Sequence, residues 1–101
     1  MLVLKGARSV IAAADGAVWI NPTGNPGMAS GGMGDALSGI LGALLAQGLG
    51  PAEAACLGVY LHGDVADDVA RHRGQIGLLA SDVIEGVPAG LRRVASGVRL
   101  V

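Results

Sequence analysis

Aromatic residues are almost absent from this sequence of 101 residues, which contains Trp19, Tyr60 and no phenylalanine. The chain still has ample material for a core, because 51% of its residues are hydrophobic and only 15% are charged. We therefore expect a core built from Ala, Val, Leu and Ile. The length fits one small domain or a piece of a larger one.

The sequence has one cysteine, and its positive and negative charges nearly balance. The single cysteine, Cys56, excludes an internal disulfide, and its apolar helical surroundings favour an inert, buried thiol. The formal net charge is −1, and the arginines near the C-terminus form no basic stripe with interleaved aromatics. We therefore expect no nucleic-acid partner.

Long apolar runs are missing as well. The run from Ala36 to Ala46 is well short of the ~18 residues that suggest a membrane span. The first residues show no basic stretch followed by an apolar run and a cleavage site. Together with the low cysteine content, these patterns predict a cytoplasmic protein without a membrane partner.

The first half of the chain alternates strand and turn signals. The short apolar run 1–4 predicts a buried strand. Two further apolar runs, 10–14 and 17–20, flank Asp15-Gly16, which is a strong signal for a hairpin. The segment from Asn21 to Gly34 is rich in Gly, Asn, Pro, Ser and Thr, so we expect a loop there.

The second half is helical. Leucine and isoleucine spacing predicts a helix over 35–47, and a second stripe of Gly and Ala on it suggests burial on both faces. Pro51 can begin the next helix, which we expect to run to about Arg71. A short helix over 81–85 should follow, and Pro88 should begin a last one that ends near Gly97.

The stretch most informative about chemistry is Gly31-Gly32-Met33-Gly34-Asp35, where a glycine-rich loop enters the first helix. Glycines leave backbone N–H groups open to a ligand, and the start of a helix adds unpaired donors and partial positive charge. Such a site suits phosphate. A carboxylate beside it could accept the proton of a hydroxyl that attacks a phosphoryl group. Spacing alone leaves open the simpler reading, in which Asp35 only favours the helix dipole.

Longer runs of sequence point to a family. Residues 25–35, Asn-Pro-Gly-Met-Ala-Ser-Gly-Gly-Met-Gly-Asp, together with Gly-Val-Tyr-Leu-His-Gly at 58–63, resemble the ADP-dependent NAD(P)H-hydrate dehydratases. Leu-Lys-Gly-Ala-Arg-Ser at 4–9, Leu-Leu-Ala-Gln-Gly at 44–48 and Leu-Ala-Ser-Asp at 79–82 agree with this. The resemblance covers the chain to about residue 88. The Gly-x-Gly-Asp element alone would indicate only the wider ribokinase-like superfamily.

The resemblance implies an α/β fold, in which the strands join the sheet of a ribokinase-like three-layer α/β/α domain. It also implies an activity: repair of NADH or NADPH whose nicotinamide ring has been hydrated (NADHX and NADPHX). A nucleotide, ADP or ATP, phosphorylates the ring hydroxyl, and loss of phosphate restores the double bond. Mg²⁺ is expected with the nucleotide.

Individual residues take their roles from the same resemblance. Asp35 matches the catalytic aspartate, which contacts the hydrate and serves as base. Gly32 and Gly34 match the anion-binding turn of the adenine-nucleotide site. The nucleotide-binding segment corresponds to Lys5, Gly6, Ala7, Arg8 and Ser9.

This sequence departs from the family pattern at two of these places. Ser9 stands where the family often has Thr, which keeps the hydroxyl. Met33 stands where many members have Ser or Thr, which removes a possible hydroxyl near the phosphate but leaves the backbone donors.

Other polar residues have simpler readings. Asn25 could touch substrate or act as a turn residue. His62, among apolar neighbours on the second helix, reads as a packed, hydrogen-bonded histidine. Asp64, Asp67 and Asp68 lack the spacing of a metal-binding loop, so we expect a solvated helix face.

The resemblance further suggests that the chain is the C-terminal portion of a longer domain, with a homo-oligomer as the other way to complete it. An epimerase domain precedes the dehydratase in many family members. Two other functions stay open: a ribokinase-like kinase of thiazole or pyrimidine alcohols, and an inactive nucleotide-binding remnant.

Overall fold

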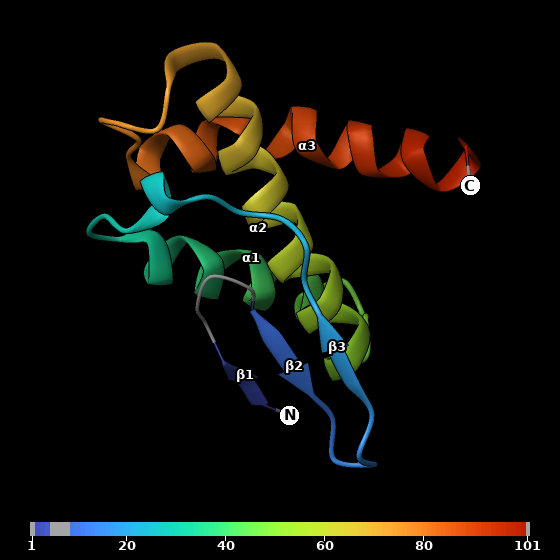
Figure 1. Cartoon of the computed structure of the whole chain (residues 1–101). Helices are drawn as coiled ribbons and strands as arrows, with labels where there is room; N and C mark the ends of the chain where they lie inside the picture. The colour runs from blue at the N-terminus through green and yellow to red at the C-terminus, as the bar shows by residue number, and fades with distance from the viewer. Residues whose placement is uncertain (1, 5–8, 101) are drawn as a thin grey trace.

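The computed structural model describes residues 2–4 and 9–100, with side chains described to Ser96. Its elements are a small sheet at the N-terminal end, a long loop, and three helices (Figure 1). The α/β class expected from the sequence is confirmed. In the described ranges, no helix is both long enough and apolar enough to cross a membrane.

The sheet has three strands, β1 (Leu2–Leu4), β2 (Val10–Ala12) and β3 (Val18–Ile20), in the order β1-β2-β3. Both pairs are antiparallel. The hairpin expected at Asp15-Gly16 is confirmed: Gly16 has a φ of 91°, and Asp15 Oδ1 accepts a bond from the Ala17 N–H at 3.0 Å. Glycine suits this turn because left-handed angles cost it nothing.

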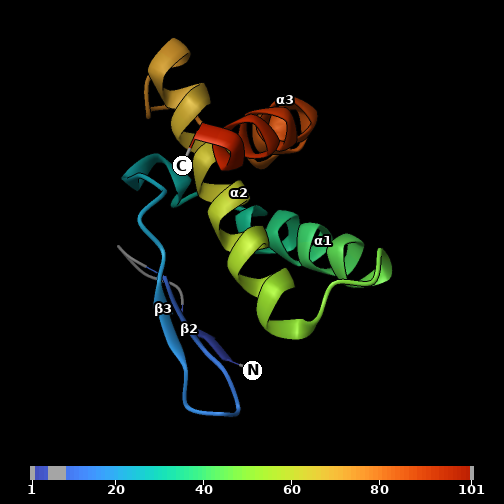
Figure 2. The same cartoon turned by 90° about the vertical axis from the view of Figure 1, so that its right-hand side faces the viewer.

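The two faces of the sheet differ in burial. Val3, Ile11 and Trp19 are paired across the strands, so they share one face, and Ile11 in their middle is fully buried. The opposite face carries large apolar side chains that are all more than half exposed: Leu2, Leu4, Val18 and Ile20. The expectation that the first strand is buried is therefore wrong for this chain, since helices cover only one face of the sheet (Figure 2).

Helix α1 (Met33–Ala46) begins two residues before the expected start and ends one before the expected end. It buries Met33, Leu37 and Leu44. Its second stripe is exposed, however: a side chain added at Gly39 or Gly42 would meet no atom within 4 Å. The expected burial on both faces is wrong, because no described element reaches the small-residue side.

Helix α2 (Pro51–Arg73) lies at the centre and contacts α1, α3 and the sheet (Figure 2). Pro51 begins it as expected, and Gly74, with a φ of 81°, follows its end. Its small buried positions allow close packing. A Cβ added to Gly58 would lie 2.5 Å from Leu41 Cδ2 of α1.

Helix α3 (Ala80–Leu100) is continuous, with Pro88 inside it. The sequence predicted two shorter helices divided at Pro88, and that prediction is wrong. Packing on α2 explains the difference: Cβ atoms added to Gly86 and Gly90 would each lie 2.5 Å from Val65 methyls, so α3 crosses close to α2 at the turn that contains the proline. This contact outweighs the hydrogen bond that proline removes.

Two apolar clusters form the core. One joins the sheet to α1 and α2 through Ile11, Leu37, Ala55 and Val59, with Cys56 packed against it. The other joins α1, α2 and α3 through Met33, Leu61, Val65, Ala66, Leu78 and Val83. The expected aliphatic core is confirmed, with Met33 as an addition, and both aromatic residues remain partly exposed.

Candidate active site

The glycine-rich loop enters α1 at Gly32, whose φ of 87° is accessible mainly to glycine. The first intrahelical hydrogen bond runs from the Ala36 N–H to Gly32 O at 3.0 Å. The amides of Met33, Gly34 and Asp35 precede that bond, and no side chain caps the helix. This end of α1 therefore offers free N–H donors to an anion.

Asp35 is exposed in the first turn of α1, next to these amides. Met33 and Leu37, two residues before and two residues after Asp35, are buried in the core. Since each helical residue is rotated by about 100° from the last, Asp35 lies on the opposite side from both. Its carboxylate is thus open to a ligand from outside the described chain.

Met33 bears on one departure from the family pattern. Its side chain is buried in the cluster with Leu61 and Val65 rather than turned toward the anion site. The missing hydroxyl at this position therefore leaves the free backbone donors unobstructed.

A cavity of about 500 Å³ lies between the loop, α2 and the inner side of α1. Its lining includes Ser9 and Asn25, two residues for which the sequence suggested binding roles, and also the buried His62. Gly32, Gly34 and Asp35 are not part of this lining. The structure therefore brings Ser9 and Asn25 together, and it places Asp35 on another face of α1.

The other proposed nucleotide-binding residues, Lys5, Gly6, Ala7 and Arg8, lie outside the described residues. Ser9 is described: its carbonyl accepts a bond from the Asn21 N–H at 2.8 Å, which ties the start of β2 to the end of β3.

Asn25 acts as a turn residue in the structure. It precedes a short 3₁₀ helix, η1 (Pro26–Met28), and its Oδ1 accepts a bond from the Gly27 N–H at 2.9 Å. Its Nδ2 donates to Asp67 Oδ1 at 2.8 Å. Contact between Asn25 and a substrate stays a prediction.

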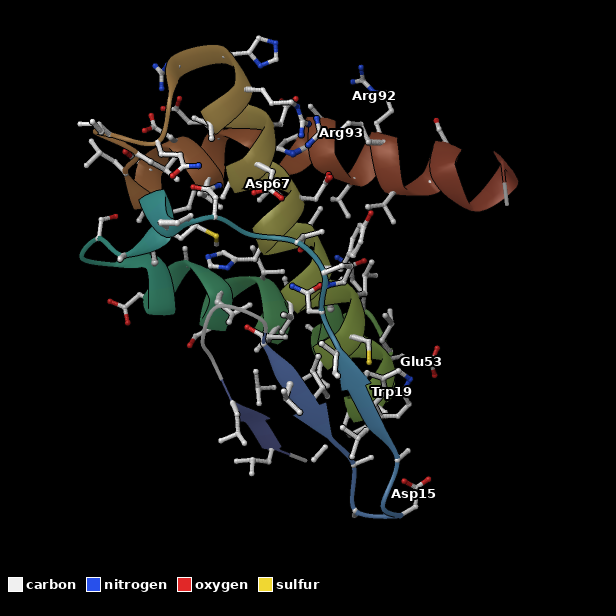
Figure 3. All side chains as sticks on the ribbon, in the orientation of Figure 1. Asp15, Trp19, Glu53, Asp67, Arg92 and Arg93 are labelled. Atoms are coloured by element: carbon white, nitrogen blue, oxygen red, sulfur yellow. The ribbon has the colours of Figure 1, made fainter. Side chains whose placement is uncertain are left out.

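The acidic residues of α2 are more than a solvated face. Asp64 and Asp68 pair with Arg93 of α3 at 3.1 and 3.4 Å. Asp67 instead holds the loop (Figure 3). Sequence reasoning missed these roles, because the bonded partners lie 25 to 43 positions away and no local pattern links them.

Magnesium has no dedicated protein cage among residues 2–4 and 9–100, where no group of three or more His, Cys, Asp or Glu side chains could hold a metal ion. Magnesium often uses one or two carboxylates together with substrate phosphates. A magnesium ion at this site would therefore be held chiefly by the phosphates of a bound nucleotide.

Cys56 is half-buried against the cluster of Ile11 and Val59, and burial raises the pKa of its thiol above the ordinary value. A raised pKa disfavours the reactive thiolate. The expectation of an inert thiol agrees with this environment.

The family model and the similar proteins all belong to the NAD(P)H-hydrate dehydratases or repair enzymes. The family model of NAD(P)H-hydrate dehydratase matches residues 1–89. A bifunctional NAD(P)H-hydrate repair enzyme of Moorella thermoacetica is 52% identical over the whole chain, which covers 19% of that enzyme. An ADP-dependent (S)-NAD(P)H-hydrate dehydratase of Neisseria meningitidis is 46% identical over 81% of the chain and 28% of its own length.

Solved structures agree. The ADP/ATP-dependent NAD(P)H-hydrate dehydratase of Bacillus subtilis, co-crystallised with ATP and Mg²⁺, matches with a TM-score of 0.86 and 40% identity over 90% of this chain and 33% of its own. A ribokinase-like superfamily protein of Enterococcus faecalis matches with a TM-score of 0.76 and 38% identity, over 90% of this chain and 31% of its own.

The chain spans less than a fifth of the bifunctional relative and about a third of these solved chains. The structural alignment with the Bacillus subtilis enzyme covers nine-tenths of this chain. The chain therefore belongs to the NAD(P)H-hydrate dehydratase family and has the ribokinase-like fold of that family.

Proposed function

We propose that this chain supplies the phosphate-binding turn and the catalytic base of an ADP-dependent dehydratase that restores NADH and NADPH from their hydrates. The observation that carries the proposal is the start of α1, where the exposed Asp35 adjoins three uncapped backbone amides. The relatives that share this segment are named for that reaction.

The proposed chemistry assigns one task to each group. The Asp35 carboxylate accepts the proton of the ring hydroxyl, whose oxygen attacks the terminal phosphoryl group of ADP and displaces AMP. The amides at the start of α1 stabilise the negative charge on the transferred group. Phosphate then leaves the ring as a proton is lost from the neighbouring carbon, and the double bond is restored.

The adenine nucleotide would bind at this helix start, and the resemblance assigns further nucleotide contacts to Lys5 to Ser9. The solved Bacillus subtilis relative was co-crystallised with ATP and Mg²⁺, which supports an adenine nucleotide as the co-substrate. Bound magnesium would supply charge neutralisation at the phosphates.

The rest of the substrate site has to come from outside this chain. Here the cavity and Asp35 face different sides of α1, and little in the described residues could grip a nicotinamide ring. We infer that the chain is the C-terminal portion of a cytoplasmic dehydratase domain, and the part of the relatives that it does not span would complete the site.

The test uses the full-length protein that carries this segment. Purified protein is mixed with ADP and hydrated NADH, and in parallel with ATP and thiazole or pyrimidine alcohols. ADP-dependent recovery of NADH is expected. Phosphoryl transfer to the alcohols without NADH recovery would replace the proposal with a small-molecule kinase, and no turnover of either kind would indicate an inactive nucleotide-binding protein.

A further inference from the structure

The loop before α1 crosses alongside α2 (Figure 1) and then contacts the segment that follows α2. Thr23 Oγ1 donates to Tyr60 O at 3.0 Å near the middle of α2. Farther along, Ser30 Oγ donates to Leu78 O at 3.1 Å, beyond the end of the helix. The path of the loop toward Gly32 is therefore held by contacts with α2 and with the segment that follows it.

Asp67 makes the charged contact in the middle of this path. Its Oδ2 accepts a bond from the Gly24 N–H at 3.0 Å, and its Oδ1 accepts one from Asn25 Nδ2 at 2.8 Å. Asn25 in turn accepts from the Gly27 N–H. One half-buried carboxylate thus bonds directly to Gly24 and Asn25 and is linked through Asn25 to Gly27, and bonds to an ionised acceptor are stronger than neutral ones.

The neighbouring aspartates on α2 have different partners. Asp64 and Asp68 form ion pairs with Arg93 on α3. Within the described residues, no ion pair is made by Asp67. Its contacts are with the loop rather than with the packing of α2 on α3.

Close packing beside these bonds leaves the loop little freedom to drift. A Cβ added to Gly27 would lie 2.6 Å from Gln75 O, and one added to Gly63 would lie 2.8 Å from the Thr23 backbone carbon. The loop backbone therefore touches α2 and the residues after it on both sides of Asp67. Losing the Asp67 bonds would release the segment between two tight contacts.

We propose that Asp67 is a positioning residue for the phosphoryl-transfer step: paired with Asn25, it holds the loop so that Gly34 and Asp35 meet the nucleotide in register. This inference rests on the proposed function. Asp67 itself touches neither nucleotide nor substrate. Its effect passes through the loop to α1, where a displacement of about 1 Å can cost roughly 10²-fold in rate.

The test exchanges the two side chains in the full-length protein. Asp67→Asn places an amide N–H₂ group against that of Asn25, and Asn25→Asp places two carboxylates in contact. The double variant N25D/D67N restores every bond, because the amide at 67 can accept from Gly24 and donate to the new carboxylate. We expect kcat to fall about 10- to 100-fold in each single variant and to recover most of the loss in the double variant.

Amide hydrogen exchange over residues 24–32 gives a second readout that does not depend on activity. Exchange should be faster in both single variants and return toward the wild-type rate in the exchanged pair. Asp64→Asn is the matched control: it loses an α2–α3 ion pair, and we expect it to change neither loop exchange nor kcat per folded molecule.

Unchanged loop exchange and kcat in Asp67→Asn would overturn the inference. So would a double variant no better than the single ones, because restoring the bonds between positions 25 and 67 would then restore neither the loop nor the rate. If the wild-type protein shows no dehydratase activity, the proposed function fails, while loop exchange still reports whether the Asn25–Asp67 pair orders the loop.

Discussion

The Asp35 carboxylate is the side chain on which the proposed chemistry depends. An amide at this position keeps the size of the side chain but cannot accept the proton of the ring hydroxyl. We expect Asp35→Asn in the full-length protein to lower the dehydratase rate by about 10²–10⁴-fold, with ADP affinity within a few-fold of wild type.

Steady-state rates and calorimetric ADP binding check this prediction on the same preparations. Glu53→Gln is a suitable control, since Glu53 is also an exposed acid in the first turn of a helix, α2. Activity of Asp35→Asn within a few-fold of wild type would reject Asp35 as the base.

Gly34 tests the phosphate turn. Its backbone is not in the left-handed region, so a side chain there is tolerated by the helix itself. A valine would instead crowd the amides that face the phosphate, and we expect Gly34→Val to weaken ADP binding by about tenfold or more, equivalent to ~1.4 kcal/mol. Ser38→Val, one turn farther along the same side, should have a smaller effect. Equal ADP affinity in folded Gly34→Val and wild type would count against the turn.

At the scale of elements, the approach of the loop to α2 depends on Gly63. A Cβ there would meet backbone and side-chain carbons of Thr23 at 2.8 Å, which cannot move away without shifting the loop. We expect Gly63→Ala to destabilise the fold by roughly 1–3 kcal/mol in chemical denaturation.

Gly58→Ala is the matched control on the same helix. Its Cβ would meet only the ends of the Leu41 and Leu44 side chains, which can rotate, so it should cost less than Gly63→Ala. The reverse order would show that the loop is not held against α2 as described.

The start of α3 gives a prediction about pH. A bond from the Leu79 N–H and a second from Arg73 hold the pKa of Asp82 below its usual range. Because the folded pKa is lowered, the stability that Asp82 contributes is present above its ordinary unfolded pKa and is lost as the pH falls through the lower folded value.

Thermal melts of wild type and Asp82→Asn check this. The variant should melt at a lower temperature near neutral pH, and the gap should close in acid. A gap that stays constant from neutral pH down to pH values below the folded pKa would show that the bonds from Leu79 and Arg73 do not stabilise ionised Asp82.

The elements that the sequence predicted well carry strong local signals. Pro51 marks the start of α2, which ends at Arg73, two residues beyond the expected end, and Asp15-Gly16 marks the hairpin. The continuity of α3 through Pro88 could not be predicted, since it depends on how closely Gly86 and Gly90 approach Val65.

The candidate site also contains residues that the sequence reveals and one whose role only the fold reveals. Gly32 and Asp35 are recognisable because their residue types and spacing serve a helix start directly. The role of Asp67 in holding the loop is invisible in the sequence, because its bonds to Gly24 and Asn25 span 43 and 42 positions. Only the folded path of the loop reveals it.

At the scale of the whole molecule, the described chain leaves two apolar surfaces open. One is the outer face of the sheet, with Leu2, Leu4, Val18 and Ile20, and the other is the small-residue side of α1. Exposed apolar surface and unpaired strand edges promote association. We therefore expect the 101-residue chain, expressed alone, to self-associate and to lack dehydratase activity.

Size-exclusion chromatography with the dehydratase assay tests this expectation. Replacing Val18 and Ile20 together by threonine should reduce association while retaining strand propensity. Ile76→Thr, at a side chain that is 99% exposed in a loop, should not. A monomeric wild-type chain that regenerates NADH with ADP would contradict the expectation.

The central claim, that these residues belong to a nucleotide-driven dehydratase, is tested most directly by following two products in one reaction. Full-length protein is given hydrated NADH and ADP, and NADH and inorganic phosphate are measured on the same samples. The account predicts equal amounts of both, appearing only with ADP and nearly abolished in Asp35→Asn. Phosphate release without NADH, or NADH recovery that needs no nucleotide, would contradict it.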